Sequence, residues 1–184
     1  MPADSKESMT LTPYGSQAMT VSNASYLKQF YDATKALGQK AVNSDFTFEI
    51  EGFEQVYLLA KQCPWPDVSV AGEIEVPSPL GATLFEPQQI KVAKQGQVSF
   101  LETVAGIIDQ TLVSIIANGG TFNAKIYEGT PTKYLRYKRI VDCFVQIDDP
   151  DRDWENRSQV LTFSGTMFYH YFGETVQGNS ADYR

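Results

Sequence analysis

Residues 61–100 read KQCPWPDVSVAGEIEVPSPLGATLFEPQQIKVAKQGQVSF, two strand-like runs joined by a loop rich in proline. In both runs, DVSVAGEIEV and QQIKVAKQGQVSF, polar and apolar residues alternate, which is typical of a strand with one apolar face. The joining loop, PSPLGATLFEP, is partly apolar, although loops are usually polar and lie on the surface. We therefore expect the apolar side chains of this loop to be buried against something.

Composition and charge exclude several classes of protein. The chain has 184 residues, enough for one domain with a real core, and its 15 basic and 22 acidic residues give a net charge of −7. This balance argues against binding to phosphates, although not against a protein past which nucleic acid moves without sticking. The two cysteines form no disulfide framework or zinc motif, and the N-terminus lacks the apolar run of a signal peptide. We expect a soluble protein made in a reducing compartment, with no membrane partner.

The periodicity along the chain predicts a mainly β protein with a packed helix, of the α+β class. Residues 1–22 predict a flexible N-terminal arm, residues 23–173 one β-barrel domain, and residues 174–184 a C-terminal arm. Helical spacing occurs in SNASYLKQFYDATKALGQ, an N-terminal helical segment, and in TVAGIIDQTLVSIIANGG. Strands are predicted in DFTFEIEGF, QVYLLAKQC, TFNAKIYEG, KYLRYKRIVDCFVQI and QVLTFSGTMFYHYFG. We expect an antiparallel β-barrel or two-sheet sandwich, with the second helix packed on it as the one flanking helix.

Residues that could carry catalysis or bind a metal form no recognisable site. His170 alternates with Phe168 and Phe172, and we expect it to be a strand residue with its hydrogen bonds satisfied. The segment DDPDRDWENRS spaces three aspartates like a calcium loop, but Trp154 stands where that loop needs glycine and Val160 where it needs glutamate. It predicts a solvated acidic turn. We therefore expect no enzymatic activity, no metal and no cofactor.

Charge is distributed unevenly along the chain. Residues 45–76 contain seven acidic side chains and one lysine, whereas residues 131–147 contain four basic side chains and one aspartate. These segments are either two solvated strand faces or an acidic and a basic surface that meet between copies of the protein or line one surface. The sequence leaves both interpretations open.

The order of these elements resembles that of the tail tube proteins of contractile-tailed bacteriophages, which share their fold with the tube protein of type VI secretion systems. The resemblance covers about residues 23–173: a helical segment, FTFEIEGF, the proline turn of LLAKQCPWP, a protruding hairpin-like region, a helix and the final strand GTMFYHYFGE. It implies a structural virion protein whose hexameric rings stack into the inner tail tube, the conduit for DNA during ejection. It also implies synthesis in the host cytoplasm, assembly with sheath and baseplate proteins, and DNA that passes without specific binding.

The resemblance assigns a role to the apolar loop, because in these proteins the protruding loop inserts into the next ring of the stack. Prolines lower the entropy lost when such a loop is ordered. The predicted inter-ring contact residues are Pro77, Pro79, Leu80, Leu84, Phe85 and Pro87. Alternation in the two runs sets apolar residues against polar ones, and we expect the polar face of the ribbon to line the lumen, with Glu73, Glu75, Gln89 and Lys91.

Three alternatives stay open at this point. The apolar loop could fold back on the core of its own chain. The long arm before residue 22 is compatible with a baseplate tube initiator of the same fold. A monomeric β-barrel that binds a small apolar ligand would explain the aromatic final strands as the lining of a cavity.

Overall fold

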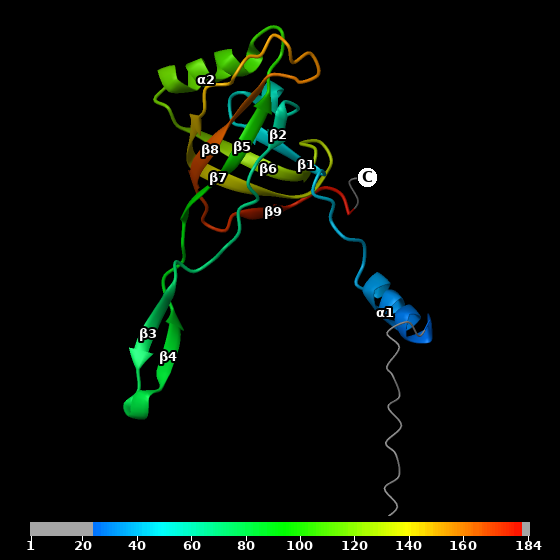
Figure 1. The fold of residues 1–184 in the computed structure, drawn as a ribbon, viewed down its shortest axis with the longest axis vertical. Helices are drawn as coiled ribbons and strands as arrows, with labels where there is room; N and C mark the ends of the chain where they lie inside the picture. Colours follow the sequence, from blue (N-terminus) through cyan, green and yellow to red (C-terminus); the bar gives the residue numbers. More distant parts are fainter. Residues whose placement is uncertain (1–23, 182–184) are drawn as a thin grey trace, which may run out of the picture. The chain divides into compact units, whose positions relative to one another are not determined.

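The computed structural model of the chain describes residues 24–181 (Figure 1). The predicted N-terminal arm, residues 1–22, and the last residues of the predicted C-terminal arm, 182–184, lie outside this part. The chain divides into two units, Met1–Ala41 and Val42–Arg184. No helix in the described part of the chain is both long and apolar enough to cross a bilayer.

The described part of the first unit is dominated by helix α1, Ala24–Ala36, which confirms the predicted N-terminal helix. It ends at Gly38, whose φ of 85° places it in the left-handed region and whose amide donates to the carbonyl of Lys35 at 3.0 Å. This is the usual glycine stop of a helix. The apolar stripe of this helix is exposed, and none of its residues is buried.

The second unit is built on a seven-stranded antiparallel sheet in the order β1-β6-β7-β8-β5-β2, with β9 paired to β7. The long strand β7 changes partner along its length, because its first part pairs with β6 and its last part with β8. The strands are β1 (Phe46–Ile50), β2 (Ala60–Gln62), β5 (Ala93–Leu101), β6 (Phe122–Gly129), β7 (Tyr134–Ile147), β8 (Thr162–His170) and β9 (Thr175–Gln177).

The structure confirms a mainly β, α+β fold but not the predicted barrel or sandwich. In the part of the chain described, β1 and β2 end the sheet and are not paired with each other, so one chain forms no closed barrel. The only other sheet described is a two-stranded hairpin, β3 (Glu73–Pro77) with β4 (Thr83–Pro87). The predicted strand QVYLLAKQC is shorter than expected, because its first residues belong to the 3₁₀ turn η1 (Glu54–Val56).

The core fills the inner face of the sheet and the side of helix α2 (Ile107–Ala117) that packs on it, as predicted. In Figure 1 the helix lies across one end of the sheet. Ile108 and Ile115 are 2% and 4% exposed, and burying each contributes about 1.5–3 kcal/mol before entropy is counted. The strands contribute Phe48, Ile50, Val98, Phe100, Ile126, Ile140 and Met167.

At two glycines in the strands of the second unit, a neighbouring segment lies too close for a side chain. A Cβ on Gly165 in β8 would collide with the carbonyl oxygen of Gln146 in β7. A Cβ on Gly96 in β5 would collide with Pro64, so the CPWP segment lies directly on the sheet. The chain is therefore fixed to the sheet shortly before it enters the hairpin.

The predicted free C-terminal arm is partly wrong. Thr175–Gln177 form β9, and Arg136, Tyr137 and Lys138 of β7 are its pairing partners. The physical reason is that Thr175 and Val176 are β-branched and favour a strand when an unpaired neighbour is available. Gly178 continues the contact by donating its amide to the carbonyl of Leu135 at 2.6 Å.

Candidate assembly interface

The hairpin formed by β3 and β4 stands apart from the sheet (Figure 1). All residues of β4 are exposed, and Leu84 and Phe85 keep 58% and 68% of their surface accessible. The ribbon continues toward the sheet, because the Ala71 amide donates to Gln89 and the Lys91 amide to Ser69, both at 2.8 Å. The apolar loop therefore does not fold back on the core of its own chain.

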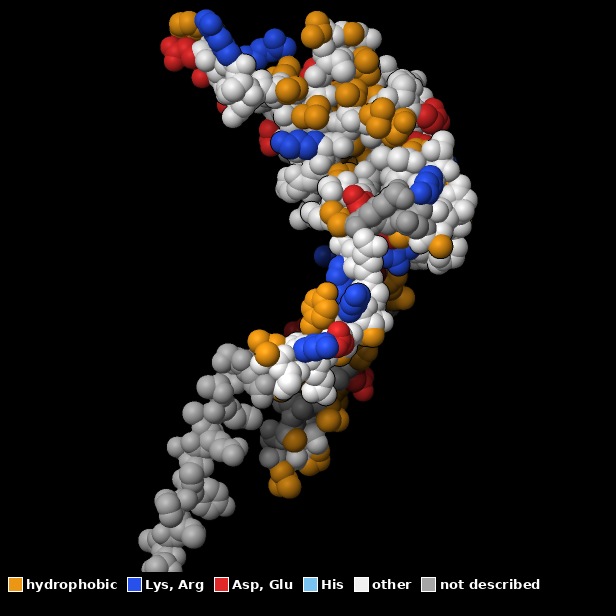
Figure 2. Space-filling view, turned by 90° about the vertical axis from the view of Figure 1, so that its right-hand side faces the viewer, with side chains coloured by type: hydrophobic (Ala, Val, Ile, Leu, Met, Phe, Trp, Pro, Cys, Tyr) orange, Lys and Arg blue, Asp and Glu red, His pale blue; other side chains and the backbone are white. Residues whose placement is uncertain are grey.

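The tip of the hairpin presents a leucine. Pro79–Gly81 form a 3₁₀ turn closed by the Ser78 amide, which donates to the carbonyl of Ala82 at 2.8 Å. Leu80 has a φ of 65°, a conformation that costs a residue with a side chain about 1 kcal/mol, and its side chain is fully exposed. In Figure 2 hydrophobic side chains reach the lowest described residues, which belong to this tip. An exposed apolar side chain held in a costly conformation favours a role in contact with another molecule.

The structure brings the predicted contact residues together on one ribbon but divides them between its faces. The register pairs Val76 with Leu84 and Glu75 with Phe85, and paired residues share a face. One face carries Ile74, Val76, Leu84 and Glu86, and we call it the apolar face. The opposite face carries Glu73, Glu75, Pro77, Thr83, Phe85 and Pro87, and we call it the acidic face.

The ribbon is less cleanly divided into polar and apolar faces than the sequence predicts. Phe85 is paired with Glu75, and Glu86 is paired with Ile74. The turn determines which residues of the two strands are paired, and the alternation within one strand cannot predict this pairing. The other two predicted lumen residues, Gln89 and Lys91, come after β4, where the ribbon returns to the sheet.

Acidic and basic strand surfaces meet within the chain. Arg139 donates to both carboxylate oxygens of Glu51, at 3.1 and 3.3 Å, and Arg136 contacts Glu128 at 2.6 Å. The hydrogen bond from Arg139 holds the pKa of Glu51 below its usual range, with Lys125 adding to the effect. These charges are compensated inside the subunit, so the hypothesis that they meet between copies is not needed to explain them.

An exposed patch on the outer face of the sheet was not predicted from the sequence. Phe144 of β7 and Phe168 of β8 are paired, and their rings stack with centroids 4.9 Å apart and planes inclined by 11°. Phe144 is turned outward by a break in the β7 register between Val141 and Phe144, where Asp142 has a φ of 49°. Such a bulge moves the following side chains to the opposite face.

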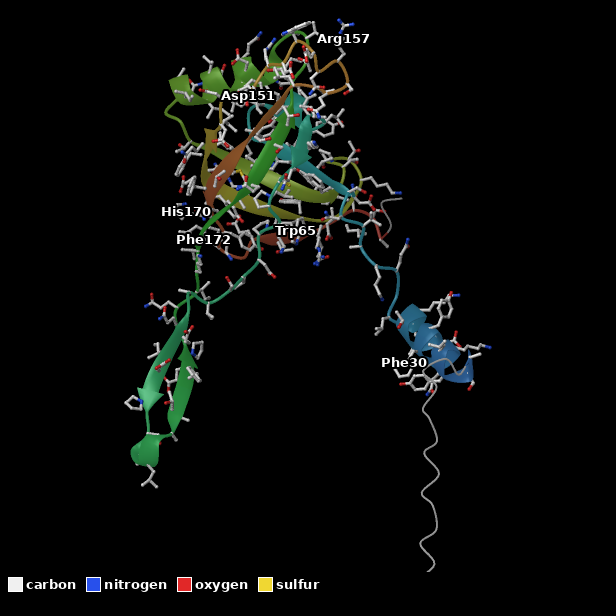
Figure 3. The ribbon with its side chains drawn as sticks, in the orientation of Figure 1. Phe30, Trp65, Asp151, Arg157, His170 and Phe172 are labelled. Atoms are coloured by element: carbon white, nitrogen blue, oxygen red, sulfur yellow. The ribbon has the colours of Figure 1, made fainter. Side chains whose placement is uncertain are left out.

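His170 lies at the end of β8, next to this patch (Figure 3). Its ring stacks on Phe172, but its Nδ1 atom is shielded from solvent and has no hydrogen-bond partner in the part of the chain described. The prediction of a satisfied histidine is therefore wrong. The patch forms one wall of a depression of about 440 Å³ that is lined chiefly by Lys91, Lys94, Gln95, Phe144, Phe168 and His170.

The acidic segment DDPDRDWENRS is a turn at the opposite end of the sheet, where Figure 3 shows Asp151 and Arg157. Nearly all of its residues are exposed, as predicted. Residues 24–181 contain no group of three or more histidine, cysteine or acidic side chains able to hold a metal ion. Burial raises the pKa of Cys63 and that of Cys143 to about 12, so both thiols stay protonated at neutral pH.

The fold is similar to that of chains from contractile injection systems, which confirms the predicted resemblance at the level of fold. A chain of the sheath–tube complex of an extracellular contractile injection system, PVC, in its extended state superposes with a TM-score of 0.52 and 13% identity, over 78% of this chain and 95% of that one.

Two further solved structures share this fold. A chain of the tube-terminating cap of the anti-feeding prophage matches with a TM-score of 0.50 and 13% identity, over 76% of this chain and 91% of that one. A chain of the six-fold symmetrised baseplate of the anti-feeding prophage matches with a TM-score of 0.50 and 12% identity, over 76% and 97%. No protein family and no curated protein matches the sequence.

Proposed function

We propose that the chain is the tube subunit of a contractile tail, a structural protein without enzymatic activity that forms rings which stack through the β3–β4 hairpin. The single observation that carries this proposal is the exposed apolar ribbon, with Leu80, Leu84 and Phe85 in water on a fold of the tube type. A free subunit gains nothing from these exposed side chains, whereas burying Leu80 and Leu84 in a stack releases the water around them.

Rings of six subunits fit this proposal, and the six-fold symmetry of the similar baseplate supports that number. The two free sheet ends, β1 and β2, support closure by neighbours, because unpaired strand edges invite pairing. In the ring, the barrel that one chain leaves open is then completed by the next. The sheath, cap and baseplate assemblies among the similar structures favour sheath and baseplate proteins as further partners, in the tail of a virion assembled in the host.

The acidic face of the hairpin lines the lumen in this account, together with Gln89 at its root. Glu73 and Glu75 are exposed and make no ion pair in the part of the chain described. Carboxylates on a channel wall repel DNA phosphates weakly, so a duplex moves past without binding. The net charge of −7 is consistent with this conduit.

The test is a pair of substitutions in the hairpin, Leu84→Ser with Phe85→Ser. Both side chains are exposed, so we expect the unassembled subunit to keep its stability within about 0.5 kcal/mol, whereas long assemblies disappear from electron micrographs. Val113→Ser is the matched control, since Val113 is 61% exposed on α2. A loss of about 2–5 kcal/mol per truncated side chain in the unassembled protein would instead place the hairpin in the core of its own subunit.

The length of the assemblies separates the main tube from a cap or an initiator of the same fold. A main tube subunit adds to itself indefinitely, because its hairpin and its docking surface belong to the same chain. A baseplate tube initiator or a terminating cap would form single rings and extend only when mixed with a second protein.

A further inference from the structure

The apolar face of the hairpin requires a complementary surface, and the depression beside Phe144 and Phe168 has the matching chemistry. Ile74 and Leu84 are 47% and 58% exposed on the ribbon, and Phe144 is 45% exposed on the sheet. Flat, stacked rings provide an apolar platform on which aliphatic side chains pack well.

Charge is complementary between the same two surfaces. Strands β3 and β4 contain three glutamates and no basic residue, and Glu86 belongs to the apolar face. The depression contains Lys91, Lys94 and His170 and no acidic side chain. Lys94 donates to the hydroxyl of Ser69 at 3.1 Å, while the ammonium group of Lys91 has no hydrogen-bond or ion-pair partner in the part of the chain described.

The hairpin cannot fill the depression of its own chain. Backbone hydrogen bonds hold the ribbon extended as far as Lys91. The next residue, Val92, is held at the end of β8, because its carbonyl accepts a hydrogen bond from the Tyr171 amide at 3.0 Å. Leu84 lies seven residues from Lys91 along a strand, roughly 23 Å away. The occupant of the depression must therefore come from another molecule.

We propose that the depression formed by β5, β7 and β8 receives the apolar face of the hairpin of a second copy of this chain. Leu84 and Ile74 of one copy cover the stacked rings of Phe144 and Phe168 of the other, and Glu86 pairs with Lys91. The acidic face then stays turned away from the sheet, toward the lumen.

This inference rests on the proposed function, because it assumes that the hairpin joins subunits, and it adds the surface that the hairpin binds. It also distinguishes two neighbouring residues. Leu84 lies on the docking face and Phe85 on the opposite face. Leu84→Ser alone should therefore reduce assembly far more than Phe85→Ser alone, whereas a nonspecific apolar contact would make the two substitutions equivalent.

The decisive experiment is cross-linking with two introduced thiols, Leu84→Cys and Phe144→Cys in one chain. At neutral pH the native thiols stay protonated, so mild oxidation acts on the introduced pair. In tubes verified by microscopy we expect a ladder of covalent oligomers on a non-reducing gel. The controls are Leu84→Cys alone, which detects contact between two tips, and Leu84→Cys with Val113→Cys, a thiol on the exposed side of α2.

The outcomes separate this inference from the proposed function. Verified tubes without a ladder, or with the same ladder in a control, place the hairpin on another surface and overturn the docking site while the tube function stands. Wild-type protein that never assembles contradicts the proposed function itself.

A charge exchange keeps the inference falsifiable if the cysteine variant does not fold. Glu86→Lys and Lys91→Glu should each lower the sedimentable fraction about tenfold, because like charges then face each other, and the double variant should recover it to within about twofold. Additive losses in the double variant would show that Glu86 and Lys91 do not meet.

Discussion

Glu102 shows how a single residue fixes the start of a helix in this protein. Its carboxylate accepts hydrogen bonds from the amides of Thr103 at 2.7 Å, Ile108 at 3.1 Å and Asp109 at 2.9 Å. Thr103 contributes one bond as well, because its hydroxyl accepts from the Ile107 amide at 3.2 Å. Burial opposes ionisation of Glu102, but the amides of Asp109, Thr103 and Ile108 outweigh it and hold its pKa below the usual range.

We expect Glu102→Gln to lower the free energy of unfolding at pH 7 by about 1 kcal/mol, since an uncharged cap binds the helix N-terminus less strongly. The folded-state pKa of Glu102 lies below its unfolded-state value, so its contribution is complete above the unfolded pKa and disappears as the pH falls through the folded one. Urea unfolding of the unassembled protein at a series of pH values measures this.

The difference between the wild type and Glu102→Gln should therefore shrink as the pH is lowered. Glu75→Gln, a change of the same kind on the exposed hairpin, is the control and should differ little from the wild type at any pH. A difference that stays constant with pH would mean that the charge of Glu102 does not act through the helix amides.

At the residue scale the sequence predicts the effects of local chemistry but not those of register. The close approach at Gly165 follows from a lone glycine inside a strand. The outward position of Phe144 cannot be predicted from the sequence, because it depends on the bulge at Asp142. The amide of Asp142 donates to the side chain of Asn123 at 3.1 Å, 19 residues away in sequence. The same reason explains why the sequence assigned Leu84 and Phe85 to a single contact.

At the scale of elements, the sheet has two free ends, and the proposed ring pairs them. The sequence predicts the existence and order of most strands, because alternation is local, but not the short β2 or the pairing of β9, which tertiary contacts decide. The proposed closure depends on pairing between chains, so no single sequence or subunit can display it.

We expect the amides of β1 and β2 to exchange with solvent faster than those of β8 in the unassembled subunit, because β8 is paired on both sides. In the assembly, exchange in at least one edge strand should slow by about tenfold or more, whereas β8 should change little. Hydrogen–deuterium exchange on separated subunits and tubes gives the comparison. Equal protection of both edge strands in the two states would count against closure by β-pairing.

At the scale of the whole molecule, a sheet with its own core carries an exposed ribbon that does not contribute to that core. The inner face of the sheet is filled by Phe48, Phe100 and Met167, side chains that leave it packed rather than hollow. A small-ligand barrel would need that interior to be open. In the proposed tube, the acidic face of the ribbon is the wall that nucleic acid passes without binding.

Replacing Glu73 and Glu75 with lysine tests the lumen. We expect rings and tubes to form, but the tubes should retain DNA at low salt and release it as salt rises, because each lysine that contacts a phosphate displaces a counterion. Glu155→Lys in the exposed turn after β7 is the control. Verified tubes of the double variant that hold no DNA at low salt and show unchanged ejection would place these glutamates on an outer surface.

Electron microscopy of the purified wild-type protein in negative stain tests the central claim most directly. The account predicts rings with a central hole that stack into tubes as concentration rises, and a return to short particles when Leu84 and Phe85 are both replaced by serine. A uniform monomer at high concentration, with no rings or filaments, would contradict it.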